Sequence, residues 1–274
     1  MKHQLKQLIV RSMPGSGVIM RATSKAGCTT LAHALIRHST GKGFDGDPHV
    51  KGEAPFDWGP TTLPTFHRSD LHGITSVRNP YERILSAYLD KVVCYPHHLH
   101  GNGVMEFHCY RGGDRRYTRL RDCFQFGSRY EDRQVEEFER FILALGLVYL
   151  EGKFPPLRDR HFDPYDQPIS QFREMVVSRG GKFSVLRMES FNEDLARVLP
   201  GGVDPEKPTV ANKGSVKKAR PLGEFFASKK VVETIQAIYE KDFLNWNYSP
   251  EPPNPTPYPI FPDKNESNPQ KVKP

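Results

Sequence analysis

Two stretches of the chain carry polar side chains of the kinds that bind a phosphate dianion. In residues 73–91, Arg78 follows a short β-branched run and Ser86 lies further along the expected helix. Arginine offers a planar fork of donors, and a helix N-terminus adds partial positive charge, so this pair suits a phosphate group. The alternative is structural: Arg78 pairs with Asp70 or Asp90, and Ser86 is an ordinary surface residue.

The second stretch is the loop at residues 24–30, which reads Ser-Lys-Ala-Gly-Cys-Thr-Thr. Backbone N–H groups from residues 26–30 would face outward at the start of the next helix, Thr29 and Thr30 add hydroxyl donors, and Lys25 adds a mobile charge. The loop is not a Walker A sequence, because Lys25 precedes the turn instead of standing directly before the hydroxyl residue. The stretch nevertheless predicts a phosphate cradle.

In both regions a strand is expected first and a helix after it. Residues 18–20 and 74–77 are short apolar or β-branched runs, and residues 31–37 follow the loop as a helix. Asn79 and Pro80 mark a helix start, with Asn as the N-cap and Pro at the first helical position. The apolar residues of this second helix recur with helical spacing and predict one face packed on a sheet: Tyr81, Ile84, Leu85, Tyr88, Leu89 and Val92.

The rest of the chain repeats the alternation of strands and helices. Helices and a strand are expected at the following positions: helices at 135–145, 171–177, 189–199 and 231–243, and a strand at 182–187. Such alternation predicts an α/β protein with a parallel sheet flanked by helices.

The domain prediction is a single domain over residues 1–249. Two of its segments, 39–66 and 93–134, look loop-rich and are assigned to the acceptor side. Proline and polar residues dominate residues 250–274, so this tail is expected to be poorly ordered.

Composition narrows the functional classes only in part. The formal net charge of +7 suits an anionic ligand, a polyanionic substrate or nucleic acid, but no block of residues is densely cationic. The four cysteines show no paired CxxC spacing, so neither a zinc knuckle nor a disulfide framework is indicated. The N-terminus lacks the apolar core of a signal peptide and no run approaches a membrane span, so the chain is expected to be soluble and cytoplasmic.

One segment between residues 94 and 109 is rich in potential metal ligands. Its spacing matches no standard zinc site, so a solvated loop facing the substrate is the preferred interpretation. The residues concerned are these: Cys94, His97, His98, His100, His108 and Cys109.

Residues 24–30 and 77–91 together resemble the two nucleotide-binding signatures of sulfotransferases that use 3′-phosphoadenosine 5′-phosphosulfate (PAPS). The second, Val-Arg-Asn-Pro-Tyr-Glu-Arg-Ile-Leu-Ser-Ala-Tyr-Leu-Asp-Lys, is the more specific. It is similar to the form found in carbohydrate sulfotransferases of the chondroitin 4-O-sulfotransferase type. The similarity continues in the same order to the segment at 238–249, so it spans roughly residues 18–249.

The resemblance implies a P-loop-like three-layer fold with a central parallel sheet, PAPS as the donor and no metal. It also implies, by position in the two signatures, which residues hold the nucleotide. The residues implied are these: Lys25, Ala26, Gly27, Cys28, Thr29 and Thr30 at the 5′ phosphosulfate, Arg78 and Ser86 at the 3′-phosphate, and Asn212, Lys213 and Ser215 in a loop that closes over the nucleotide.

The reaction implied is in-line transfer of a sulfuryl group to an acceptor hydroxyl, with a carbohydrate as the expected acceptor. Lys25 is the candidate for stabilising the bridging oxygen as charge develops there. His67 and His161 are the candidates for the base that takes the hydroxyl proton. Four further residues stay open for that role: Glu53, Asp57, Glu189 and His72.

Two other functional classes stay open. A nucleoside-triphosphate-dependent kinase would share the strand, phosphate loop and helix, although Lys25 is misplaced for it. A non-enzymatic module that binds nucleic acid or another polyanion would explain the charge but not the spacing of Arg78 and Ser86. No nucleic-acid partner is expected under the sulfotransferase interpretation, and the sequence leaves the oligomeric state open.

Overall fold

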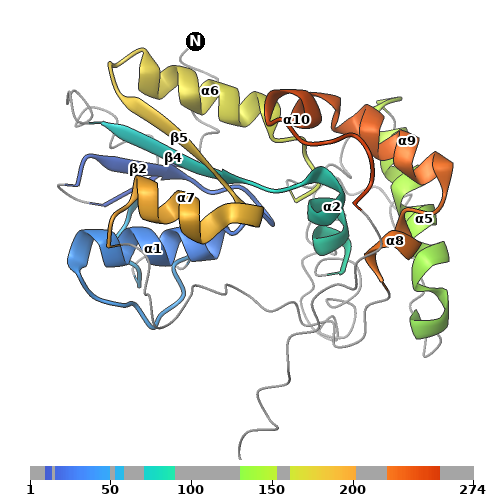
Figure 1. Cartoon of the computed structure of the whole chain (residues 1–274), viewed down its shortest axis with the longest axis horizontal. Helices are drawn as coiled ribbons and strands as arrows, with labels where there is room; N and C mark the ends of the chain where they lie inside the picture. Colours follow the sequence, from blue (N-terminus) through green and yellow to red (C-terminus); the bar gives the residue numbers. More distant parts are fainter. Residues whose placement is uncertain are drawn as a thin grey trace, which may run out of the picture.

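The computed structural model of the chain describes residues 10–13, 16–49, 53–58, 71–89, 130–152, 161–201 and 221–253. Within these residues one five-stranded sheet has the strand order β3-β1-β2-β4-β5. The strands have the following bounds: β1 (Val10–Ser12), β2 (Val18–Arg21), β3 (Asp57–Trp58), β4 (His72–Val77) and β5 (Lys182–Arg187). Figure 1 shows β2, β4 and β5 side by side.

The sheet is mixed. Strands β2, β4 and β5 run parallel, as predicted, whereas β1 pairs antiparallel with both β2 and β3. The segment 13–17 that joins β1 to β2 is too short for the crossover that a parallel pair needs, so these strands form a hairpin. The predicted α/β class with a parallel sheet flanked by helices is therefore confirmed for β2, β4 and β5, and β1 and β3 add an antiparallel edge.

Helices cover both faces of the sheet and give it three layers. Helices α1 (Cys28–Thr40) and α7 (Phe191–Val198) lie on one face, and α6 (Asp166–Val177) lies on the other (Figure 1). On β2, Val18 and Met20 pack in the cluster that includes α1, whereas Ile19 packs in the cluster that includes α6. This alternation is the period of two expected of a strand buried on both faces.

A second apolar core lies beyond the carboxyl end of β4 and is built mainly from helices, with no described strand in it (Figure 1). Residues of α2 predicted to form one apolar face are buried there, and Val92 lies outside the described residues. Aromatic rings dominate this core; Tyr88, for example, packs edge-on against Phe138, with ring centroids 5.1 Å apart. Its helices have these bounds: α2 (Pro80–Tyr88), α5 (Tyr130–Tyr149), α8 (Leu222–Phe225), α9 (Lys229–Ile238) and α10 (Glu240–Asn245).

Several element boundaries differ from the predictions. Helix α1 begins at Cys28, inside the predicted loop, and the helix predicted at 189–199 starts with a 3₁₀ turn, η7 (Met188–Ser190). The helix predicted at 231–243 divides at Tyr239, whose hydroxyl donates to the carbonyl oxygen of Phe162 at 2.6 Å. Strand β3 lies within the segment predicted to be loop-rich at 39–66.

Helix α5 begins at residue 130, within the other segment predicted to be loop-rich. The His- and Cys-rich segment at 94–109 and the tail from residue 254 lie outside the described residues. In the described part of the chain, no helix is both long and apolar enough to cross a membrane.

Candidate active site

The loop after β2 and the start of α2 meet at the carboxyl edge of the sheet. Because β2 and β4 are parallel, with Arg21 opposite Thr75, both chain segments leave the sheet at the same edge. The hydroxyl of Thr23 donates to the carbonyl oxygen of Ser76 and lies 3.2 Å from its Oγ atom. Both residues are buried. The two stretches that the sequence predicts to bind phosphate are therefore joined by a buried polar contact.

The loop holds an unusual backbone conformation that leads directly into α1. Lys25 and Gly27 both have left-handed φ angles, 63° and 73°, and the buried Ala26 lies between them. Glycine suits this φ angle, and a Cβ atom at Gly27 would lie 2.3 Å from Sδ of Met188, so a larger residue would also displace the Met188 side chain.

The first turn of α1 contains no acidic residue, and no described side chain caps it. A helix start in this state presents N–H groups and partial positive charge to an anion. Thr30 is buried within that first turn, whereas Cys28 and Thr29 are half-buried beside it. The loop therefore has the properties required to hold a phosphate group, with Thr29 the more accessible hydroxyl.

The structure adds His49, which the sequence analysis did not single out, to this loop. Its Nε2 atom lies 2.8 Å from Oγ1 of Thr29 and 4.0 Å from Sγ of Cys28. The backbone N–H of His49 donates to Oδ1 of Asp47 at 2.8 Å, which forms an Asx turn around Pro48. The sequence Asp-Pro-His was the one available signal that a turn holds this histidine in place.

The start of α2 is built as the sequence predicts. Asn79 caps the helix by accepting a hydrogen bond from the backbone N–H of Tyr81 at 2.9 Å, and Pro80 occupies the first turn. Arg78 stands just before the cap, and its Nε and Nη2 atoms donate to Oε2 of Glu82 at 3.2 and 3.0 Å. Glu82 is thus an ion-pair partner of Arg78, whereas Asp70 and Asp90 lie outside the described residues.

Arg78 reaches Glu82 from its position before the cap, and Glu82 and Ser86, four residues apart, lie on one face of α2. The Arg78 and Glu82 side chains are 18% and 29% exposed. The predicted 3′-phosphate pair therefore has a carboxylate between its members. A phosphate bound by Arg78 and Ser86 would have to displace Glu82 or share Arg78 with it.

Glu189, one of the residues left open as a base, connects the end of β5 to α2. Its carboxylate accepts from the backbone N–H of Asn79 at 2.8 Å and from the hydroxyl of Tyr248 at 3.0 Å. Burial and this carboxylate raise the pKa of Tyr248, so its hydroxyl remains a donor. Both contacts give Glu189 a structural role at the start of α2.

The remaining candidates for the base occupy different places. His161 is half-buried in the turn that leads into α6, next to Phe162, which packs against Phe141 with ring centroids 5.0 Å apart. Glu53 is exposed, and Asp57 lies in the edge strand β3. The other predicted site residues lie outside the described residues: His67, Asn212, Lys213 and Ser215.

His72 lies at the start of β4, whereas Lys25 lies beyond the carboxyl ends of the parallel strands. Each strand residue advances the chain by about 3.3 Å, so the full length of β4 separates His72 from the site by about 16 Å. Its Nε2 atom lies 2.8 Å from Oγ of Ser184, and burial together with Lys182 and His38 lowers its pKa. Both the position and this contact argue against His72 as the base.

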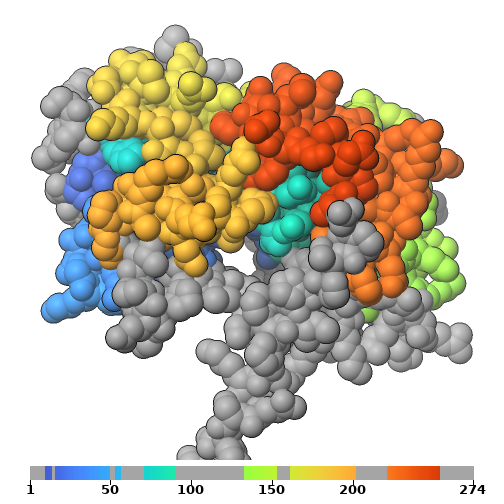
Figure 2. Space-filling model, viewed as in Figure 1, coloured from blue at the N-terminus to red at the C-terminus, as the bar shows by residue number. Residues whose placement is uncertain are grey.

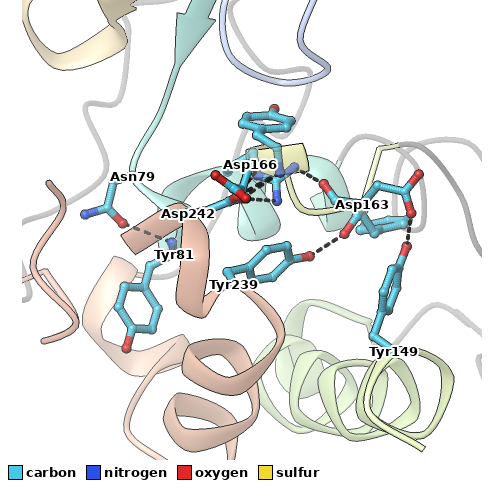
Figure 3. A network of polar contacts seen from close by, with 10 residues as sticks. Asn79, Tyr81, Tyr149, Asp163, Asp166, Tyr239 and Asp242 are labelled. Carbon is cyan, nitrogen blue, oxygen red and sulfur yellow. Dashed lines mark hydrogen bonds and ion pairs between the residues drawn. The ribbon is translucent and has the colours of Figure 1, made fainter. Parts of the chain in front are cut away.

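A buried network of polar side chains holds α2 against the start of α6 and against α10 (Figure 3). Arg83 of α2 is 1% exposed, and its guanidinium lies between the rings of Tyr165 and Tyr239, 3.7 and 4.6 Å from their centroids. Asp242 of α10 lies 3.5 Å from Nη2 of Arg83. Asp242 also accepts from the backbone N–H groups of Tyr165 and Asp166, the latter at 2.7 Å.

This network joins α2, the N-terminus of α6 and α10 through one carboxylate. Arg83 donates in addition to the carbonyl oxygen of Asp163 at 2.8 Å, and the carboxylate of Asp163 accepts from the hydroxyl of Tyr149 at 2.8 Å. The network therefore fixes the orientation of α2, which carries Ser86 and begins directly after Arg78 and its cap. In Figure 2 part of the β4–α2 segment remains visible at the surface between residues near position 190 and the C-terminal helices.

Potential metal ligands do not gather in the described part of the chain. There, no three His, Cys, Asp or Glu side chains lie close enough together to hold a metal ion. The electrostatic features at the carboxyl edge of the sheet are instead Lys25, Arg78 and the start of α1.

A three-layer α/β fold with a loop of this kind between the first parallel strand and its helix is the architecture of P-loop-like proteins. The chain belongs to the sulfotransferase family, whose model matches residues 12–249. No curated protein and no solved structure gave a significant match. The family predicted from residues 24–30 and 77–91 is thereby confirmed, and the protein is an enzyme. Membership implies sulfuryl transfer with PAPS as the donor.

Proposed function

We propose that the enzyme transfers the sulfuryl group of PAPS to a hydroxyl of a carbohydrate, with the nucleotide bound across the loop at 24–30 and the start of α2. One observation carries the proposal: the buried contact of Thr23 with Ser76 joins the two phosphate-binding stretches at one edge of the sheet. Ligands of open α/β sheets bind at that edge, outside the carboxyl ends of the parallel strands.

The residues of the loop suit the 5′ end of the donor. The left-handed residues Lys25 and Gly27 and the uncapped first turn of α1 supply backbone N–H groups, and Thr29 supplies a hydroxyl. Cys28 and Thr30 belong to the same turn. The proposal assigns this group of residues to the phosphosulfate.

Arg78 and Ser86 suit the 3′-phosphate. A guanidinium can exchange a carboxylate for a phosphate because both anions accept its paired donors, and the dianionic phosphate carries more charge. Glu82 would then release Arg78, or share it, when the nucleotide binds. The loop with Asn212, Lys213 and Ser215, which lies outside the described residues, is proposed to cover the nucleotide.

The donor supplies the sulfuryl group, and the chain's own residues must stabilise the leaving phosphate and remove one proton. The acceptor oxygen forms a bond to sulfur while the bond from sulfur to the bridging phosphate oxygen breaks. Lys25 stabilises the charge that develops on that oxygen, and a base, His67 or His161, takes the proton of the hydroxyl. Because protein cations hold the leaving phosphate, the proposal needs no metal.

A carbohydrate is the proposed acceptor because the segment at 77–91 is similar to the 3′-phosphate signature of carbohydrate sulfotransferases. Of the two segments assigned to the acceptor side, 39–66 and 93–134, residues 50–52, 59–66 and 93–129 lie outside the described residues. The acceptor therefore has to be found by a screen.

A calorimetric titration tests donor recognition. The full chain is titrated with adenosine 3′,5′-bisphosphate and, separately, with ATP and magnesium. We expect binding of the bisphosphate to be tighter, and Arg78→Ala to weaken it by at least tenfold, as loss of a charge-assisted contact predicts. Arg197→Ala is the matched control, since that side chain is 73% exposed and pairs within α7. A preference for ATP with magnesium would refute the proposal in favour of a kinase.

A screen with labelled PAPS tests the reaction and the acceptor class. Glycans and small alcohols are compared as acceptors, and Lys25→Ala is measured on the best of them. The variant should lose more turnover than affinity for adenosine 3′,5′-bisphosphate, because the charge on the bridging oxygen develops only during transfer. Equal losses in both quantities would count against this role of Lys25, and transfer to small alcohols but no glycan would refute the carbohydrate assignment.

A further inference from the structure

A chain of three polar side chains runs from β1 to the loop at 24–30 and the first turn of α1. Arg11 of β1 is 4% exposed, and its Nη1 and Nη2 atoms lie 3.2 Å from the carbonyl oxygen of Pro48 and 2.8 Å from Nδ1 of His49. The other ring nitrogen of His49, Nε2, lies 2.8 Å from Oγ1 of Thr29. The guanidinium also lies near the ring of Phe56, 5.9 Å from its centroid.

The polarity of this chain follows from the chemistry of Arg11. A guanidinium has only N–H donors and stays protonated, so Nδ1 of His49 must accept its hydrogen bond. In a neutral imidazole the proton then lies on Nε2, which donates to Oγ1 of Thr29. With its oxygen accepting from His49, the Thr29 hydroxyl meets an anionic oxygen as a donor, because phosphate and sulfate oxygens only accept.

We propose that Arg11 and His49 are positioning residues that orient the Thr29 hydroxyl as a donor to a sulfate or phosphate oxygen of the donor nucleotide. The inference rests on the proposed function. It also implies that His49 is not the base that takes the proton of the acceptor hydroxyl, although His49 is exposed and lies beside the loop. A general base must direct a free lone pair at the acceptor hydroxyl, whereas in His49 Nδ1 accepts from Arg11 and Nε2 carries a proton.

Two substitutions of His49 separate positioning from base catalysis. Glutamine can reproduce both hydrogen bonds, because its amide oxygen can accept from Arg11 and its amide nitrogen can donate to Thr29, but it cannot act as a base. We expect His49→Ala to lower kcat/KM for PAPS about three- to tenfold, the range for one hydrogen bond, and His49→Gln to stay within about twofold of the wild type. Because His49 is exposed, both variants are expected to fold.

The opposite results overturn the inference. If His49 were the base, both variants would lose about 100-fold or more of kcat, and glutamine would not rescue. An unchanged kcat/KM in His49→Ala would show that the chain of hydrogen bonds does not orient Thr29 for catalysis.

A measurement without turnover tests the same chain independently. In the protein labelled with ¹⁵N-histidine, NMR should show Nε2 of His49 protonated and Nδ1 unprotonated, and Arg11→Met should remove this preference. A proton on Nδ1 in the wild type would overturn the inference even if the enzyme is active. Conversely, failure of the wild type to bind adenosine 3′,5′-bisphosphate would refute the proposed function while leaving this tautomer test decisive for the hydrogen-bond chain.

Discussion

Replacement of Asp242 by asparagine tests whether the buried network holds α2 in place. Asp242 is 2% exposed and is shared by Arg83 and by two backbone N–H groups at the start of α6. Asparagine has nearly the same shape but no charge, and one of its two terminal atoms is a donor instead of an acceptor. The substitution therefore leaves the buried Arg83 guanidinium without its carboxylate and at least one N–H contact without an acceptor.

The magnitude follows from what remains buried. Removing one partner of a buried ion pair costs about 3–5 kcal/mol, because the other charge stays in the interior. Proteins of this size are stable by about 5–15 kcal/mol, so Asp242→Asn should remove roughly a fifth or more of the total. For a chain of this length each kcal/mol lowers Tm by about 2–4 °C, which gives a decrease of about 6–20 °C.

Urea unfolding of the full chain measures this cost. Glu233→Gln is the control, because Glu233 and its partner Lys229 are 59% and 87% exposed and the change should cost under about 1 kcal/mol. The double variant Arg83→Met/Asp242→Asn should cost less than the sum of its single changes, since the unpaired charge is gone. A loss below about 1 kcal/mol for Asp242→Asn would refute the argument that this carboxylate compensates Arg83.

Three further predictions concern the loop, the sheet and α2. Gly27→Ala should destabilise the protein by about 1–3 kcal/mol more than Gly41→Ala in urea unfolding, because both glycines have φ near 70° but only Gly27 meets a neighbouring side chain; equal losses would contradict this. The pKa of His72 is lowered in the folded state, so the unfolded state takes up its proton first as the pH falls through about 6.5. The free energy of unfolding of the wild type should therefore decrease from pH 8 to pH 5 more than that of His72→Gln. Parallel pH profiles of the two proteins would exclude this linkage. Glu82→Gln should tighten binding of adenosine 3′,5′-bisphosphate about two- to fivefold by calorimetry, because it removes the carboxylate that pairs with Arg78; weaker binding would mean that Glu82 instead holds Arg78 in its binding position.

Local patterns predicted the parts of this fold whose causes are local. Asn79 and Pro80 fix the start of α2 by a side-chain cap and a preset φ angle, and the spacing from Tyr81 to Leu89 defines its buried face. The strand at 182–187 was predicted with the bounds that the structure shows. By contrast, β1 contains the charged Arg11 and is stabilised by its pairing with β2 and β3, which no local pattern reveals.

The candidate site shows the same division. The sequence alone determined the family, and it singled out the two stretches that are predicted to bind phosphate, because each stretch is contiguous along the chain. Only the tertiary structure decided that Glu82 pairs with Arg78, that Glu189 braces α2 and that His72 lies at the far edge of the sheet. It also brought Arg11 and His49 to Thr29 across a long separation in sequence. These pairings depend on the directions in which strands leave the sheet, and that geometry exists only once the chain has folded.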